Sequence, residues 1–360
     1  MKKIFCIVLI IALFKIERSA AQGCVAIRST GGAACMMANH ASDSLTKWSV
    51  NLNYRYFKSY KHFVGKEEQK VREEQGSEVI NYSTTVDFFV QYNINRRWSL
   101  GFDLPILANT RSSLYEHDGK TRHTTESFGL GDMRLTAYRW MVDPAAHRKW
   151  NVQLGLGIKL PTGDYKYQDH FHKTDSTQVL GPVDQSIQLG DGGTGFTTEI
   201  NAFYNVAYHL QAYGNFYYLF NPREQNGTST ARGGTPSASS IAYGSDVMSV
   251  PDQMMVRGGA GYTFHRLYLS AGIRYEVLPV YDLIGGSEGF RRPGRVTSIE
   301  PGLNYSFRKI TAYAYVPFAI SRNRTQSVPD KNRTEITGVY AHGDAAFADY
   351  VINVGLAVRF

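Results

Sequence analysis

Apolar and polar residues alternate with a period of two through much of this 360-residue chain. The last segment shows the pattern most clearly. Its even-numbered positions are all apolar, namely Tyr350, Ile352, Val354, Leu356, Val358 and Phe360. Successive side chains of a β-strand point to opposite faces, so this period predicts a strand with one apolar and one polar face.

The same pattern predicts about twelve strands along the chain. They cover residues 48–56, 80–92, 98–104, 128–140, 150–160, 196–206, 210–220, 254–264, 267–277, 299–307, 310–320 and 350–360. In the fourth segment the alternation changes parity near Gly131, which predicts a β-bulge. Short turns and long polar loops, such as 109–126 and 162–192, alternate between the segments.

This organisation predicts an all-β fold, a transmembrane antiparallel up-and-down β-barrel in the outer membrane of a Gram-negative cell. Such barrels have short periplasmic turns and long extracellular loops. Tyrosine is abundant, with 24 residues, and the mean hydropathy is −0.30. Both values fit a wall that faces lipid on one side only. A soluble jelly roll or sandwich is the alternative, but it does not predict the asymmetry between loops.

The last strand and the outer face predict partners. Tyr350 and Phe360 give that strand the terminal aromatic pattern that we interpret as the signal for the barrel-assembly machinery. The apolar faces predict contact with outer-membrane lipid. Lysines and arginines are scattered, and no nucleic-acid motif is present, so we expect no nucleic-acid partner.

The N-terminus predicts export. Lys2 and Lys3 precede an apolar run over residues 4–14, and small residues at 19–21 offer a cleavage site. We therefore expect a signal peptide over 1–21, a periplasmic or plug segment over 22–46, and the barrel over 47–360. The chain carries a formal charge of +8. Without the signal peptide the charge is about +5, which is weak evidence for an anionic partner.

Two cysteines remain after cleavage, Cys24 and Cys35. The periplasm and cell exterior are oxidising, so we expect a disulfide between them. Lipid modification of Cys24 is the alternative. No further cysteine or histidine stands at ligand spacing, so neither a metal site nor a cofactor is predicted.

Strand parity points a set of charged side chains into the barrel. It comprises Arg55, Asp87, Asp103, Asp132, Arg134, Lys159, Glu199, Arg257, Arg274, Glu276, Glu300 and Arg359. Charges of both signs can set a transverse field that filters solutes, or they can pair and close the interior. Inward aromatic residues are Phe89, Tyr138, Phe203, Tyr213, Tyr217, Tyr313 and Tyr315. They would form either a slide for solutes or a filling.

Two motifs resemble a known family. Gly129-Leu130-Gly131-Asp132 opens the fourth strand, and Lys159-Leu160-Pro161-Thr162-Gly163-Asp164 ends the fifth. Together with the glycine-rich stretch 189–195, they are similar to the outer-membrane transporter family named for the meta-pathway of phenol degradation. The resemblance covers residues 80–220. It implies a barrel that transports small, often hydrophobic or aromatic solutes.

We therefore expect a channel that passes small solutes by passive diffusion. One alternative is a closed structural or adhesive barrel. Another is an outer-membrane lipid-modifying enzyme, but its serine and histidine would have to meet on the lipid-facing wall. The only His-x-Ser sequence, His40-Ala41-Ser42, precedes the first strand. His170 and His172, in a loop, are interpreted as solvated side chains and not as metal ligands.

Overall fold

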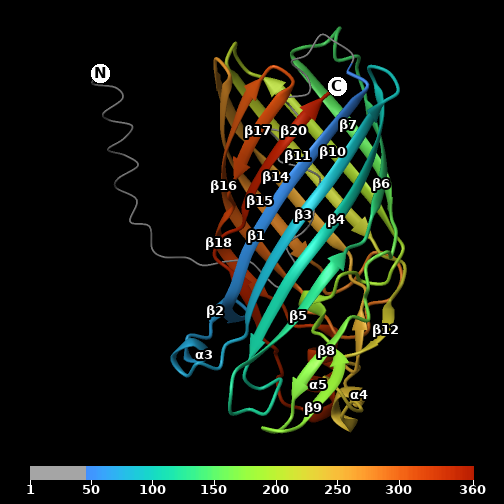
Figure 1. Cartoon of the computed structure of the whole chain (residues 1–360), viewed down its shortest axis with the longest axis vertical. Coiled ribbons are helices and arrows are strands. Elements are labelled where there is room, and N and C mark those ends of the chain that lie inside the picture. Colours follow the sequence, from blue (N-terminus) through green and yellow to red (C-terminus); the bar gives the residue numbers. More distant parts are fainter. Residues whose placement is uncertain (1–45) are drawn as a thin grey trace, which may run out of the picture.

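Twelve strands pair edge to edge into a closed antiparallel barrel, as predicted (Figure 1). The computed structural model describes residues 46–360. Nine barrel strands are continuous: β1 (Trp48–Val64), β3 (Ile80–Asn93), β4 (Trp98–Ser113), β7 (Trp150–Lys159), β10 (Gly195–Asn205), β11 (Leu210–Phe220), β14 (Gln253–Phe264), β15 (Leu267–Leu278) and β16 (Gly294–Phe307). Three are each split in two: β5 (His123–Leu130) with β6 (Arg134–Trp140), β17 (Ile310–Tyr315) with β18 (Phe318–Arg324), and β19 (Ala345–Ala348) with β20 (Ile352–Arg359). Pairing of β1 with β20 closes the ring.

The outer face of the wall is apolar. Leu156 on β7 is 67% exposed and Phe128 on β5 is 69% exposed, and on the other barrel strands exposed apolar residues also recur at every second position. In water such a band would be strongly unfavourable, whereas in a bilayer it matches the hydrocarbon. The chain is therefore an outer-membrane barrel. No described helix is long and apolar enough to cross a bilayer.

The four tryptophans mark one rim of this band. Trp48, Trp98, Trp140 and Trp150 all lie at strand ends beside the short turns. Indole rings prefer the boundary between lipid and water. The C-terminus lies at this same end, at the top of Figure 1, and short turns belong on the periplasmic side.

The predicted bulge near Gly131 is confirmed. On β4, Ile106 pairs with Leu130 and Asp103 pairs with Arg134, so the β5–β6 side carries one extra residue. The backbone N–H of Gly131 still bonds to the carbonyl of Pro105, at 2.8 Å. The extra residue reverses parity, which is why the outward positions are even on β5 and odd on β6.

Two predicted loops are shorter than the sequence indicated. Residues 109–126 were expected to be a polar loop, yet β4 continues to Ser113 and β5 begins at His123. Likewise β1 runs eight residues beyond the predicted Tyr56, to Val64. Beyond the lipid band the outward positions are no longer consistently apolar, for example Lys58 on β1 and Thr110 on β4, so the regular alternation ends although the hydrogen-bonded ladder continues.

The long loops carry small elements at the outer end (bottom of Figure 1). These are β2 (Glu67–Glu68), α3 (Val71–Glu74), β8 (Gln168–His172), β9 (Gln178–Pro182), η1 (Gln185–Ile187), β12 (Gln225–Ser229), α4 (Ala238–Ala242), β13 (Val247–Ser249) and α5 (Val328–Thr337). We name the loops L2 (114–122), L3 (160–194), L4 (221–252), L5 (279–293) and L6 (325–344). Several predictions lie outside the described residues: the signal peptide, the 22–46 segment except its last residue, the Cys24–Cys35 disulfide, and His40 with Ser42.

Candidate functional site

The predicted lumen charges lie on the inner side of the wall, and most of them form two clusters. In the first, Arg134 donates to Asp103 from Nε at 3.2 Å and to the Tyr217 hydroxyl at 3.2 Å. Nearby, the Tyr138 hydroxyl donates to Glu199 at 3.3 Å. Pairing of this kind offsets the cost of removing charges from water.

The second cluster lies across β14, β15 and β16. Arg274 contacts Glu276 at 2.8 Å and Glu300 at 3.3 Å, and Arg257 lies 3.8 Å from Glu300. The other predicted residues lie elsewhere on the inner face of the wall or beside these clusters, and Lys159 is the cross-strand neighbour of Arg134. Asp87 accepts a hydrogen bond from Asn53 at 3.2 Å. Arg55 is buried and lines a cavity described below.

The inward aromatic rings narrow the interior. Six of the seven predicted rings are buried, and all but Phe89 are less than 9% exposed. Some rings lie flat against glycines of neighbouring strands. A Cβ added to Gly155 would come within 2.7 Å of the Tyr138 ring, so the ring occupies the place of a side chain. The rings therefore pack against the wall.

The three motif segments meet at one group of contacts where L3 joins the wall. Lys159, at the end of β7, lies 3.5 Å from Asp132 and also pairs with Asp191. Asp132 accepts the backbone N–H groups of Gly163 at 3.0 Å and of Asp191 at 3.1 Å. The carboxylate at the bulge thus ties both ends of L3 to the wall.

Two glycines allow the two ends of L3 to pass close to each other at these contacts. A Cβ on Gly163 would lie 2.5 Å from the carbonyl oxygen of Leu189, and one on Gly190 would lie 2.5 Å from Asp132 Oδ1. No side chain fits at either position. Sequence analysis could find the motif, but only the fold shows that it holds L3 in place.

Tied in this way, L3 lies over the lumen. The carbonyl of Ile187 accepts from the Ser127 hydroxyl at 2.5 Å and from Asn109 Nδ2 at 3.5 Å, and both donors belong to the inner wall. On the periplasmic side of L3, inside the barrel, lies a cavity of about 130 Å³. Arg55, Arg134, Lys159, Tyr217 and Leu219 line it from the wall; Gln188, Leu189, Met248 and Pro251 line it from L3 and L4.

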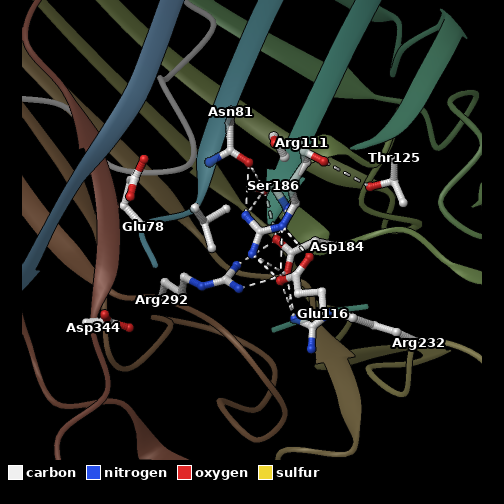
Figure 2. Close-up of polar contacts among 12 residues, drawn as sticks. Glu78, Asn81, Arg111, Glu116, Thr125, Asp184, Ser186, Arg232, Arg292 and Asp344 are labelled. Carbon is white, nitrogen blue, oxygen red and sulfur yellow. Dashed lines mark hydrogen bonds and ion pairs between the residues drawn. The ribbon is translucent and has the colours of Figure 1, made fainter. Parts of the chain in front are cut away.

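A buried ion cluster joins the outer loops around Asp184 (Figure 2). Arg292 of L5 binds both carboxylate oxygens of Asp184, at 2.9 and 2.7 Å. Arg111 of β4 lies 3.4 Å from Asp184 and 2.6 Å from Glu116 of L2. Arg232 of L4 lies 2.8 Å from Glu116. Five segments of the chain therefore meet at two carboxylates, and we call this group the Asp184 cluster.

The cluster changes the acidity of Asp184. Burial alone would raise the pKa of this carboxyl, but Arg111 and Arg292 overcome that effect and hold the pKa well below its usual value. Asp184 also caps η1 by accepting the N–H of Ser186 at 3.0 Å. Asp184 therefore stays ionised and orders the turn that covers the lumen.

Sequence reasoning missed this cluster. Its members come from loops and from the outer end of β4, where hydrophobic alternation has ended. Arg111 alone carried a signal, because it shares the parity of Asp103 and would face inward if the strand were extended.

Three imidazoles meet where L2 contacts the β8–β9 hairpin. The rings of His123 and His172 stack, with centroids 3.9 Å apart and planes 6° apart. The backbone N–H of His172 donates to His117 Nδ1 at 3.1 Å. His170, by contrast, is exposed, and its Nδ1 lies 3.8 Å from Asp169.

This contact is expected to weaken in acid. Burial, together with repulsion from His123 and His172, lowers the pKa of His117 to about 4. A released loop would have a histidine pKa of about 6.5, so it takes up a proton first. The contact is therefore fully stable above pH of about 6.5 and loses stability as the pH falls toward 4. Amide hydrogen exchange at Phe171 and His172, corrected for intrinsic rates, should accelerate at pH 5 relative to pH 7.5.

The β12–β13 hairpin contains no histidine and serves as the internal reference for that measurement. A His117→Asn variant should lose the pH dependence. Equal acceleration in both hairpins would contradict the assignment to His117.

The fold resembles that of known outer-membrane barrels. An outer membrane channel from Pseudomonas putida F1 aligns over 89% of this chain and 97% of its own, at 12% identity and a TM-score of 0.59. The translocator domain of the autotransporter NalP from Neisseria meningitidis covers 91% and 96%, at 13% identity and a TM-score of 0.47. The monoaromatic hydrocarbon channel CymD covers 93% and 95%, at 10% identity and a TM-score of 0.42. No family model and no curated protein sequence matches the chain.

Proposed function

We propose that this protein is an outer-membrane channel through which small solutes diffuse passively. The observation that carries the proposal is the cavity of about 130 Å³ inside the barrel, below L3 and L4. This volume is slightly smaller than that of a cavity of about 150 Å³ that binds benzene. The space therefore suits a solute with a single ring or a compound of similar size.

The lining supports a solute with an apolar body. Phe57, Leu107, Leu219 and Met248 supply apolar surface, while Arg55, Arg134 and Lys159 supply charge. A site of this kind binds an apolar group and orients it through a few polar contacts. Small hydrophobic or aromatic compounds fit it, in agreement with the family that the motifs resemble. Lipid and the barrel-assembly machinery would be its other partners.

Liposome swelling and planar-bilayer recordings test the proposal. We expect small, discrete conductance steps and faster swelling for solutes of single-ring size than for larger ones. Met248→Trp should slow both processes severalfold, because Met248 is buried and lines the cavity. Leu154→Trp is the matched control, since Leu154 is 39% exposed on the lipid face.

A structural barrel whose interior is blocked to solutes is the second candidate, and the pairing of the interior charges favours it. In that case the wild-type protein would show no conductance at any voltage and no swelling with any solute. Equal effects of the two tryptophan variants would also argue against passage through the cavity.

A further inference from the structure

A second, larger cavity lies at the outer mouth, on the extracellular side of L3. Its volume is about 360 Å³, and L3, L4, L5, L6 and the outer ends of β1 and β4 line it. We call it the vestibule. Six arginines contribute to its lining: Arg111, Arg232, Arg291, Arg292, Arg324 and Arg333. The carboxylates of the lining are Asp184, Asp330 and Asp344.

Positive charge is in excess around the vestibule. The six arginines of the lining face five carboxylates, namely Asp184, Asp330 and Asp344 of the lining together with Glu116 and Asp282, so the formal charge of these groups is positive by one. Arg291 pairs with Asp282, and Arg324 pairs with Asp330, so these two pairs are neutral. Arg333 is exposed, and no carboxylate of the described residues lies within ion-pair distance of it.

Unused donors accompany this charge. The Nε atoms of Arg232 and Arg324 are buried, and neither has a hydrogen-bond partner within residues 46–360. Arg324 as a whole is only 3% exposed. A buried donor without an acceptor costs free energy, and an anion in the vestibule can supply the acceptor.

The vestibule and the inner cavity share a boundary. Met248 lines both, and η1 separates them, because Asp184 faces the vestibule while Gln185 and Ser186 line the inner cavity. On the lumen side of this boundary the inner cavity presents Arg55, Arg134 and Lys159, together with Asp132 and Asp191, which both pair with Lys159. Arginine and lysine side chains, several of them in ion pairs, therefore continue from the outer mouth into the lumen.

We propose that the vestibule captures small organic anions, carboxylates in particular, and that the channel prefers them to neutral solutes of the same shape. A cavity whose lining carries an excess of one sign of charge raises the local concentration of the opposite ion. Arginine suits a carboxylate because its planar donors match the two oxygens. The preference in transport rests on the proposed channel function, whereas the capture of anions does not.

The test compares benzoate with benzamide, which has nearly the same shape and no charge. Isothermal titration of the full chain in detergent measures binding, and liposome swelling measures passage. We expect benzoate to bind more tightly and to enter faster than benzamide. In the Arg232→Gln/Arg333→Gln double variant, benzoate affinity should fall by about two- to fivefold for each charge removed, while benzamide should be unaffected.

Lys331→Gln is the matched control, because Lys331 lies on α5 with Arg333 but contacts the Tyr281 hydroxyl and does not line the vestibule. It should keep the wild-type affinity for benzoate. Arg333→Gln alone changes only an exposed side chain, so it tests the idea even if the double variant folds poorly. Heat-modifiable gel mobility reports folding of each variant.

The outcomes separate this inference from the channel itself. Benzoate binding without any swelling would leave the vestibule site standing and overturn the channel. Swelling with no preference between the two probes, and no difference in binding, would overturn the site and leave the channel. An equal loss of benzoate affinity in Lys331→Gln would also overturn the site.

Discussion

Replacing Asp184 with asparagine is expected to release the outer loops from the mouth of the barrel. The change removes the buried negative charge that Arg111, Arg232 and Arg292 share, and Arg111 is itself buried. Loss of one partner from a buried ion pair costs about 3–5 kcal/mol. Hydrogen exchange at η1 should accelerate accordingly. If L3 restricts the lumen, single-channel conductance should rise at the same time.

Asp175→Asn is the matched control for that experiment. Asp175 lies at the exposed tip of the β8–β9 hairpin in the same loop. It should leave both exchange and conductance unchanged. If the two variants behave alike, the Asp184 cluster does not hold L3. If exchange accelerates without a change in conductance, the cluster holds L3, but L3 does not limit passage.

The second large effect concerns the wall. Leu156→Arg places a charge on the lipid-facing side of β7, where Leu156 is 67% exposed. A cation near the middle of the bilayer costs about 2–4 kcal/mol in an outer-membrane barrel. We expect a reduced yield of heat-modifiable barrel in lipid vesicles and a lower midpoint of urea unfolding.

Leu180→Arg provides the comparison, because Leu180 has a similar exposure of 53% but lies on β9, in a loop outside the membrane. It should fold like the wild type. Equal losses in both variants would show that exposure, and not the lipid environment, determines the cost. Equal tolerance would place the apolar band outside the bilayer.

The wall of the barrel follows from local physics, and this explains why the sequence predicted it so well. Each residue of a strand alternates between two solvents, lipid outside and a polar interior, so the period of two records the fold residue by residue. Even the exception at Gly131 was readable. One extra residue reverses parity, and the reversal appears directly in the positions of Phe128 and Leu135.

At the outer mouth of the barrel the sequence shows no such period of two. On the extracellular side of the lipid band both faces of β4 are polar, so the alternation of apolar and polar residues ends while the strand continues to Ser113. The loops beyond it carry no period at all. The sequence shows that Asp184 and Arg292 are charged. It does not show that these two residues, 108 positions apart, form a bidentate contact.

The sequence by itself determined the number of strands, their faces, the bulge and the set of inward charges, because each of these depends on residues close together in the chain. Only the tertiary structure decided which charges pair, that the three motif segments tie L3 into the lumen, and that six arginines from five segments gather in one vestibule. Such contacts depend on how distant segments pack, and a buried ion pair is set by the relative positions of its two partners, which no local pattern encodes.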